Sequence, residues 1–462
     1  MSASNEMLAG PLGRAAQVTR RARPGLASSP LLLALLLAAA CGGTAAPPPA
    51  QAPTAGQAAE ETAAAPVVDT QQGQQIATVD EPSSPRANAA PRPEMSAQAQ
   101  EAHAAGLKAF AAGDLAGARA QFQAATAADD KAFQSFYSLG VIAERQGQPA
   151  AASAAYQRAV EIVPDYEPAI AAYGILEAKR GNVDRAASYL KERQGRFPES
   201  AAITAALAEV RSIQGDSGEA QRLAQEALKK NPDYRPAMVT LARDHYRNRR
   251  LELSLYALTG ILDGFGPENP ARDKNNAEAR LIRGLIYREK NRRKLAIDEL
   301  TRAVELRPDL VEARLQLATY MLEAGNAQGA LPHLESAVRF DNGNVLAHLN
   351  LGDAYRLLDR PKDAQRELEW VAKAAPNRPE VHYNLGLLYL LSKPIDGMTE
   401  KQMTEKAIEH LEQYKTRGVR GGPDDTEELI SRAKSKKALL EAAEQEAAAA
   451  GSGETGADAV AE

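Results

Sequence analysis

The chain has 462 residues, a formal net charge of −5, and only 5% aromatic residues. The net acidity argues against general nucleic-acid binding and against a basic membrane-hugging surface. Abundant alanine with few aromatic residues favours tightly packed helices over a β-sandwich or barrel. The single cysteine, Cys41, excludes a disulfide framework and a multi-cysteine zinc site, and the six histidines are scattered along the chain. We therefore expect no metal site and no cofactor.

The first 40 residues have the pattern of a secretory signal. Residues 14–23 are rich in arginine, and Leu31 to Ala40 is an apolar run that is too short to span a bilayer. We expect residues 1–40 to be a signal peptide, with Met7 as a possible alternative start.

The apolar run ends in small residues directly before Cys41. The segment 37–41 (LAAAC) resembles a bacterial lipoprotein box, although Ala38 stands where leucine is commonest. The resemblance implies that the sulfur of Cys41 is acylated, and Gly42 in place of aspartate implies sorting to the outer membrane. The alternative is an ordinary A-x-A cleavage site, which would release a soluble periplasmic protein.

Residues 41–96 are rich in Ala, Pro, Gln, Thr and Ser. Such a segment cannot bury enough apolar surface to offset the entropy lost on ordering. We predict a disordered tether that holds the folded part away from the membrane.

From residue 97 onward, small residues recur with a period of 34 residues. The repeated small positions are Gly106, Gly140, Gly174, Ala208 and Ala242, then, after a slip of eight residues, Gly284, Ala318, Gly352 and Gly386. Alanine or serine follows twelve positions after most of them, and proline recurs at Pro164, Pro198 and Pro232. A fixed period of this length is typical of a repeat solenoid.

The repeat resembles the tetratricopeptide family. In one unit the signature residues are Phe136, Leu139, Gly140, Gly147, Ala152, Tyr156, Ala159 and Pro164. The resemblance covers about residues 97–416 and implies nine repeats of two antiparallel helices in an all-α superhelical solenoid. Gly140 and Ala152 would lie where the two helices cross, since only a small side chain lets the backbones approach closely.

The ends of the helices are also marked in the sequence. Gly181 and Gly215 precede Asn182 and Asp216, and each glycine should end a first helix in a left-handed conformation. The recurring prolines should stop each second helix.

Two insertions interrupt the period. Residues 263–276 contain prolines and glycines without helical periodicity, and we predict a loop that separates an N-terminal stack (97–262) from a C-terminal stack (277–416). The second insertion spans residues 392–402. Insertions in solenoids map to loops that often carry contacts, although tolerated surface loops are equally compatible with the pattern.

The sequence between residues 243 and 294 is locally basic. An anionic partner, such as an acidic protein segment or a cell-wall polymer, is one interpretation, and an ordinary solvated surface is the other. The representative residues of this basic zone are Arg243, Arg247, Arg288, Arg292 and Arg293.

A candidate groove follows from the family resemblance. Asparagine directly before the Leu-Gly pair implies a ladder of amides for a ligand's backbone, and Asn350 and Asn384 occupy that place, with Gln316 one repeat earlier. An amide both donates and accepts, so it can bind an extended peptide of any sequence. Asp353 and Arg356 should lie nearby. The alternative is that these asparagines are simply consensus residues.

The C-terminus should close the solenoid. A capping-box-like start near Asp425 and an apolar stripe through Leu429, Ala433, Leu440 and Ala443 predict a capping helix over 424–447. Residues 448–462 should be a disordered tail. His348 and His382 occupy positions of large packing residues, so we expect core histidines there rather than ligands.

These features together predict a protein-binding scaffold of the cell envelope, anchored on the periplasmic side of the outer membrane. The whole layout resembles gliding-motility repeat lipoproteins, and pilus or secretin assembly lipoproteins are the alternative. An accessory part of an envelope enzyme is a weaker alternative, because no nucleophile–base constellation or phosphate-binding loop is present. We therefore expect no catalysis, no small-molecule substrate and no nucleic-acid partner.

Overall fold

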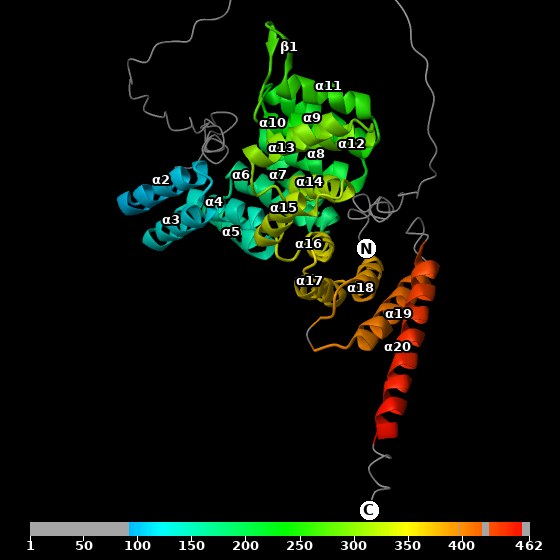
Figure 1. Ribbon diagram of the computed structural model, residues 1–462. Coiled ribbons are helices and arrows are strands. Elements are labelled where there is room, and N and C mark those ends of the chain that lie inside the picture. Colours follow the sequence, from blue (N-terminus) through cyan, green and yellow to red (C-terminus); the bar gives the residue numbers. More distant parts are fainter. Residues whose placement is uncertain (1–91, 396, 418–424, 455–462) are drawn as a thin grey trace, which may run out of the picture. The chain divides into compact units, whose positions relative to one another are not determined.

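The computed structural model describes residues 92–395, 397–417 and 425–454 (Figure 1). Nineteen helices and one short two-stranded hairpin occupy these ranges. The predicted all-α solenoid is confirmed. The predicted signal peptide, Cys41 and most of the predicted tether lie outside the described residues.

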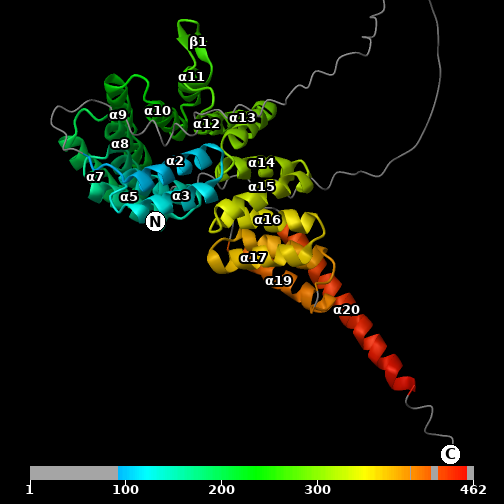
Figure 2. The ribbon, with the colours of Figure 1, turned by 90° about the vertical axis from the view of Figure 1, so that its left-hand side faces the viewer.

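Nine consecutive pairs of helices follow one another, and each pair packs against the next (Figure 2). This is the number of repeats that the 34-residue period predicts. The pairs are α2 (Ala97–Ala111) with α3 (Leu115–Ala128), α4 (Phe133–Arg145) with α5 (Pro149–Ile162), α6 (Glu167–Lys179) with α7 (Val183–Arg196), α8 (Ala201–Gln214) with α9 (Ser217–Lys230), α10 (Arg235–Arg247) with α11 (Leu251–Leu262), α12 (Ala277–Glu289) with α13 (Arg293–Leu306), α14 (Val311–Glu323) with α15 (Ala327–Phe340), α16 (Val345–Leu357) with α17 (Pro361–Ala374), and α18 (Glu380–Leu391) with α19 (Glu400–Thr416).

The helices of a pair cross at the small residues that recur in the sequence. A Cβ added to Gly140 would lie 2.4 Å from the ring of Tyr156, which is far inside van der Waals contact. Ala208 replaces the glycine in the fourth pair, and the position equivalent to Tyr156 is there the small residue Ala224. In this fourth pair a smaller partner thus offsets the added methyl group, as close packing requires.

The turn between the two helices of a pair has a residue in the left-handed region. Gly181 (φ 95°) and Gly215 (φ 85°) confirm the predicted left-handed glycines. At the equivalent turn of other pairs the residue is Arg249, Asn291 or Asp359, with φ between 55° and 60°. The left-handed turn is therefore imposed by the packing of the helix pair even where no glycine is present. Helices α5, α7 and α9 end just before Pro164, Pro198 and Pro232, as predicted.

The chain packs onto the N-terminal repeats slightly before α2 begins. The guanidinium of Arg92 lies 5.8 Å from the ring centroid of Tyr166, and the backbone amide of Ser96 donates to Asp129 at 2.8 Å. The predicted tether reached residue 96, so its last residues belong instead to the folded part. A cation–aromatic contact and a charged acceptor hold them there.

The first insertion is not only a loop. Strands β1 (Gly264–Gly266) and β2 (Asn269–Pro270) form a short antiparallel hairpin, with the ring of Phe265 stacked 4.8 Å from that of Tyr256. Gly264 has a φ of 77°, and a side chain there would meet backbone atoms of the opposite strand at 2.5 Å. The sequence analysis missed the hairpin because strands of two or three residues leave no periodic pattern.

The hydrophobic core continues past this hairpin. One cluster joins Val239, Ala242, Leu258, Ile261 and Leu262 of α10 and α11 to Ala279, Ile282 and Ile286 of α12. The insertion therefore shifts the register of the repeat, while the apolar packing runs from α11 to α12 without interruption.

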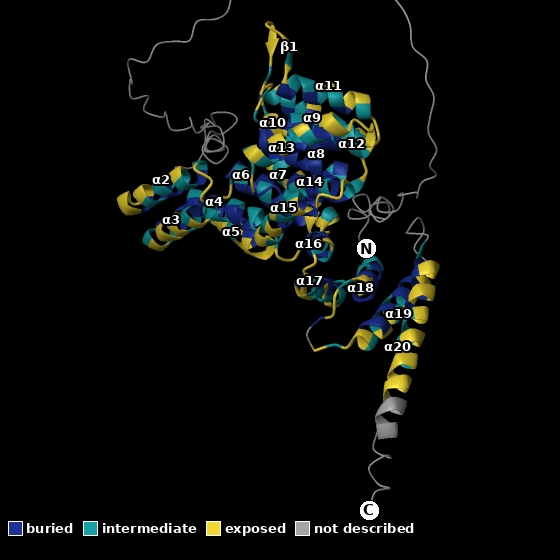
Figure 3. Cartoon of the chain, viewed as in Figure 1, coloured by how far each residue is buried: buried dark blue, intermediate teal, exposed yellow. Residues whose placement is uncertain are grey.

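Helix α20 (Thr426–Glu454) covers α19 with the buried side chains of Leu429, Ile430 and Ala433. Lys436 and Lys437 reach Glu400 and Glu405 of α19 at 2.7 Å and 2.9 Å. The helix continues past its predicted end at residue 447, because the alanine run at 447–450 is strongly helix-forming. Of the predicted stripe, Leu440 is half-buried and Ala443 is exposed, so the stripe stops early. Figure 3 shows much of α20 beyond its start in the colour of exposed residues.

The contact between the first two pairs predicts a pH dependence. His103 of α2 is 7% exposed, its Nδ1 lies 2.8 Å from Oγ of Ser135 on α4, and burial lowers its pKa to about 4. A histidine with a lowered folded pKa stabilises the fold fully above pH 6.5 and loses that contribution as the pH falls towards 4. The difference between these two pKa values corresponds to about 3 kcal/mol of folding stability.

We expect hydrogen exchange in α2 and α3 to rise steeply between pH 6.5 and 4, after correction for intrinsic rates. Glutamine at position 103 keeps a polar side chain but does not titrate, so His103→Gln should flatten this part of the profile. Identical pH profiles for the two proteins would show that another group controls the contact.

Candidate functional site

The three amides of the predicted ladder lie at equivalent positions of consecutive first helices. Gln316 is on α14, Asn350 on α16 and Asn384 on α18, each two positions before the small residue of the helix crossing. Gln316 and Asn350 are buried, whereas Asn384 is half-buried. The 34-residue period thus places the same side-chain type at the same point of each repeat.

The three amides differ in what they contact. Arg288 of α12 donates to Oε1 of Gln316, so that oxygen is already used within the chain. Asn350 is 4% exposed, and its Nδ2 is buried without a hydrogen-bond partner among the described residues. A buried donor without an acceptor is costly and calls for an explanation. An acceptor supplied by a ligand would satisfy it.

Asp353 and Arg356 lie on α16 beside Asn350 and contact each other. The guanidinium Nη2 of Arg356 donates to Oδ1 of Asp353 at 2.6 Å, and both side chains are half-buried. The pair carries no net charge, but a guanidinium has five N–H donors and only some are used here. Arg356 can therefore still donate to a ligand.

The basic zone forms ion pairs within the chain. Glu209 of α8 is only 3% exposed and lies 3.1 Å from Arg243 and 3.0 Å from Arg247 of α10. Arg243 also lies 2.7 Å from Glu278, which in turn lies 2.9 Å from Arg307. This row of alternating charges joins adjacent repeats.

The pKa values of the two carboxylates in this row are lowered. Burial alone would raise the pKa of Glu278, but the nearby Arg243 and Arg307 outweigh it and hold the pKa well below its usual range. Glu209 is affected in the same way by burial and by Arg243 and Arg247, with a lowered pKa as the result. Both carboxylates therefore stay ionised and bound to arginine at neutral pH.

Of the other arginines of the basic zone, some make contacts within the described part of the chain and one makes no ion pair there. Arg288 contacts Gln316 and lies 3.7 Å from Glu323, and Arg293 donates to the carbonyl oxygen of Tyr320 at 2.9 Å. Arg292 is exposed and makes no side-chain ion pair within the described ranges. The anionic-partner hypothesis stays a prediction, with fewer unpaired arginines than the sequence alone suggests.

Sequence reasoning did not find the row of ion pairs. The sequence nevertheless indicated such a pair, because Glu209 and Arg243 are one period apart and carry opposite charges. Equivalent positions of neighbouring repeats lie side by side in a solenoid, so opposite charges one period apart indicate a pair.

The histidines behave as core residues, as predicted. His348 and His382 are buried; the ring of His348 stacks 3.8 Å from Trp370, and its Nδ1 lies 2.6 Å from Glu367. Across the described part of the chain, no group of three or more His, Cys, Asp or Glu side chains is placed to hold a metal ion. In the same ranges, no helix has the length and apolar character needed to cross a membrane.

Comparison with known proteins agrees with the repeat fold. Segments 103–167, 239–311, 283–345 and 321–388 match family models described as tetratricopeptide repeat. The solved structure of the APC/C hetero-tetramer Cut9–Hcn1 is similar, with 17% identity and a TM-score of 0.52, over 69% of this chain and 59% of that one. This chain therefore spans less than two thirds of that protein's length.

Two smaller structures also match over most of their own length. YrrB, described as a TPR protein with an unusual peptide-binding site, is 22% identical, covers 46% of this chain and 97% of its own, and has a TM-score of 0.36. MamA is 19% identical, covers 39% of this chain and 94% of its own, and has a TM-score of 0.30. At these identities the likeness concerns the fold alone.

Proposed function

We propose that this tetratricopeptide-repeat solenoid is a non-catalytic scaffold that binds extended segments of other proteins along α14, α16 and α18. Repeats of this kind typically serve as protein-binding surfaces. The observation that carries the proposal is the buried amide of Asn350, whose Nδ2 lacks an acceptor in the described chain. A backbone carbonyl of a bound peptide is the acceptor that we assign to it.

The spacing of the amides suits an extended chain. Packed helices lie roughly 8–10 Å apart. Three residues of extended polypeptide span about 10 Å. Asn350 and Asn384 can therefore bind backbone groups three residues apart, and the free donors of Arg356 can bind a carbonyl or carboxylate beside them.

The location that we propose is the periplasmic side of the outer membrane, through a lipid on Cys41. The support is the sequence of residues 14–41: the arginine-rich start, the apolar run and the small residues before the only cysteine. A soluble periplasmic protein is the alternative. In either place the scaffold would recruit or stabilise subunits of an envelope machine.

Among such machines we favour gliding motility, because the layout of leader, spacer and repeats resembles that of its repeat lipoproteins. Assembly of a pilus or secretin is the second candidate. Crosslinking within intact cells, followed by identification of the partner attached to the C-terminal repeats, would separate the two.

Peptide binding to the groove can be tested by replacing its two asparagines. Peptides are first selected from a random twelve-residue library on the purified protein, and their affinity is then measured for the Asn350→Ala, Asn384→Ala double variant. Each lost amide leaves a backbone group of the peptide unpaired, at a cost of about 1–3 kcal/mol. We expect the double variant to bind at least about tenfold more weakly, since 1.4 kcal/mol is a factor of ten.

Matched controls lie at the equivalent positions of the N-terminal repeats. Ser138→Ala and Thr240→Ala remove a small polar side chain from α4 and α10 and should leave peptide affinity unchanged. Unchanged affinity in the double asparagine variant would reject the groove. If binding were then lost at high salt, the basic zone around Arg292 would become the preferred contact.

A further inference from the structure

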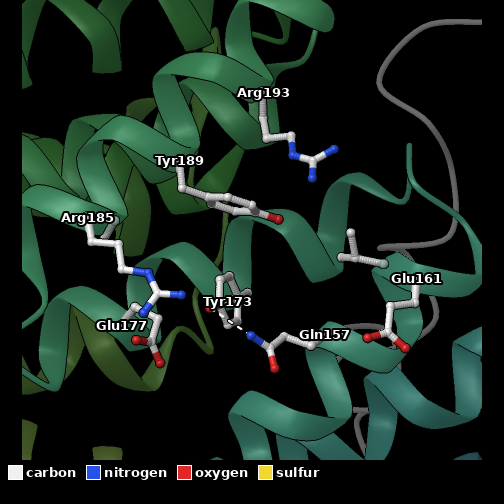
Figure 4. A pocket seen from close by; sticks show the side chains of 9 residues that line it. Gln157, Glu161, Tyr173, Glu177, Arg185, Tyr189 and Arg193 are labelled. Carbon is white, nitrogen blue, oxygen red and sulfur yellow. Dashed lines mark hydrogen bonds between the residues drawn. The ribbon is translucent and has the colours of Figure 1, made fainter.

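Helices α5, α6 and α7 line an open hollow of about 340 Å³ in the N-terminal repeats (Figure 4). This volume lies within the range of roughly 300–1,000 Å³ that ligand sites occupy. Tyr173 and Tyr189 form an aromatic wall, with ring centroids 5.2 Å apart and planes at 76°. Val160 and Ala186 add apolar surface. The hollow is therefore suited to an apolar or aromatic side chain.

The two acidic residues that line the hollow are neutralised by other residues. Glu177 accepts from Arg180 at 2.6 Å and from Asn182 at 2.8 Å. Burial would raise its pKa, but these contacts outweigh it and lower the pKa. Glu161 pairs with Arg158 at 3.2 Å. Neither carboxylate is free to balance the arginines of the hollow.

The two arginines that line the hollow have no such partner. Arg185 and Arg193 make no ion pair with the described residues. The guanidinium of Arg193 lies 5.1 Å from the ring centroid of Tyr189, and its Nε is buried without a hydrogen bond. Figure 4 shows the two guanidinium groups on opposite sides of Tyr189. The hollow thus has an aromatic centre between two unpaired positive charges.

The separation of the two arginines along α7 indicates the length of a ligand that could reach both. Arg185 and Arg193 are eight residues apart on α7, which corresponds to about 12 Å along the helix. Four residues of extended chain span about 13 Å, and residues i, i+2 and i+4 of such a chain point to the same side. An acidic residue, an aromatic residue and a second acidic residue at alternate positions would therefore face both arginines and the hollow together.

We propose that this hollow binds a partner segment of the pattern acid-x-aromatic-x-acid in extended conformation. The aromatic ring enters the hollow against Tyr173 and Tyr189, where offset or edge contacts are favourable. The two carboxylates pair with Arg185 and Arg193, and guanidinium–carboxylate pairs are the stronger, directional kind. The site lies on different helices from the groove of the proposed function and does not depend on it.

The probe is the peptide acetyl-Gly-Glu-Gly-Phe-Gly-Glu-Gly-amide, labelled with fluorescein and measured by anisotropy against the full chain. The label replaces the acetyl group at the N-terminus and is present on every probe, so the difference between probes reports on the Glu and Phe side chains. Replacing both Glu of the probe by Gln should weaken binding at least tenfold with the protein unaltered. Replacing Phe by Ala should have an effect of similar size.

On the protein side, Arg185→Ala with Arg193→Ala should weaken binding of the probe at least tenfold. Arg196→Ala is the matched control, because Arg196 is on the same helix, is exposed and already pairs with Glu192 at 2.7 Å. Arg193→Lys keeps the charge and the packing stem, so it should retain more affinity than Arg193→Ala. The Asn350→Ala, Asn384→Ala variant should bind the probe as the wild type does.

Three results would overturn the proposal. They are absence of binding to the wild-type chain, equal binding of the Gln and Glu probes, and equal binding to the double arginine variant and to Arg196→Ala. Because the probe comparison needs no protein variant, a folding defect in the arginine variants would not prevent a decision.

Discussion

Replacing Ala152 with glutamate is expected to unfold the second helix pair. Ala152 is 0% exposed at the start of α5 and packs in the core of α4 and α5, where Gly140 already touches Tyr156. A glutamate there must either displace packed side chains or bury an unpaired carboxylate. Together these effects cost several kcal/mol, which is a large part of the stability of a small domain.

The neighbouring residue provides the control. Ala151 is exposed on the same turn of α5, so Ala151→Glu introduces the same charge without entering the core. We expect thermal unfolding of Ala152→Glu to begin at a lower temperature than that of Ala151→Glu or the wild type.

The damage should be local. A solenoid passes instability mainly to adjacent repeats, so limited proteolysis should cut near α4 and α5 first and spare the region after residue 277. Because the apolar core is continuous between α11 and α12, the N-terminal and C-terminal repeats are not fully independent in stability. Equal protease resistance of Ala152→Glu and Ala151→Glu would show that Ala152 is not at a tightly packed crossing.

Replacing Cys41 with serine is expected to move the protein from the membrane to the soluble periplasmic fraction. The proposed anchor consists of acyl chains on the cysteine, and two or more chains give stable membrane binding whereas one is marginal. Serine cannot carry the thioether-linked lipid, and Cys41 is the only cysteine of the chain. The loss of anchoring should therefore be nearly complete.

Metabolic labelling with palmitate and cell fractionation measure this outcome. Wild-type protein should be labelled and sediment with membranes, while Cys41→Ser should be unlabelled and soluble. The Asn350→Ala, Asn384→Ala variant is a suitable control, because its leader is unchanged and it should remain labelled. A wild-type protein that is unlabelled and soluble would favour the alternative signal-peptide cleavage.

The basic zone illustrates where sequence reasoning was incomplete. A local excess of arginine suggested an anionic partner, but Arg243 binds Glu209 and Glu278, and Arg288 lies near Glu323. The acids that pair with Arg243 lie on the preceding and following first helices, α8 and α12. A window along the sequence counts charges near one another in the chain, whereas a solenoid pairs charges about one repeat apart.

For the candidate binding residues too, the sequence predicts the positions and the structure shows the contacts. The period alone placed Gln316, Asn350 and Asn384 at equivalent points, because a fixed repeat length puts equal positions on equal faces. The structure was needed to see that Arg288 contacts Gln316 and that Nδ2 of Asn350 is buried without an acceptor. Rotamers and neighbours, rather than position in the repeat, decide which amide is free.

The sequence by itself determined the nine helix pairs, their crossings at residues such as Gly140 and Ala152, and the left-handed turns at Gly181 and Gly215. These features are local, since each depends on residues within one 34-residue unit. The hairpin after α11, the row of ion pairs and the hollow beside Tyr189 were decided only by the tertiary structure. The hairpin strands are too short to leave a periodic pattern. The row of ion pairs and the hollow depend on side chains of different repeats, which come together only when the helices stack.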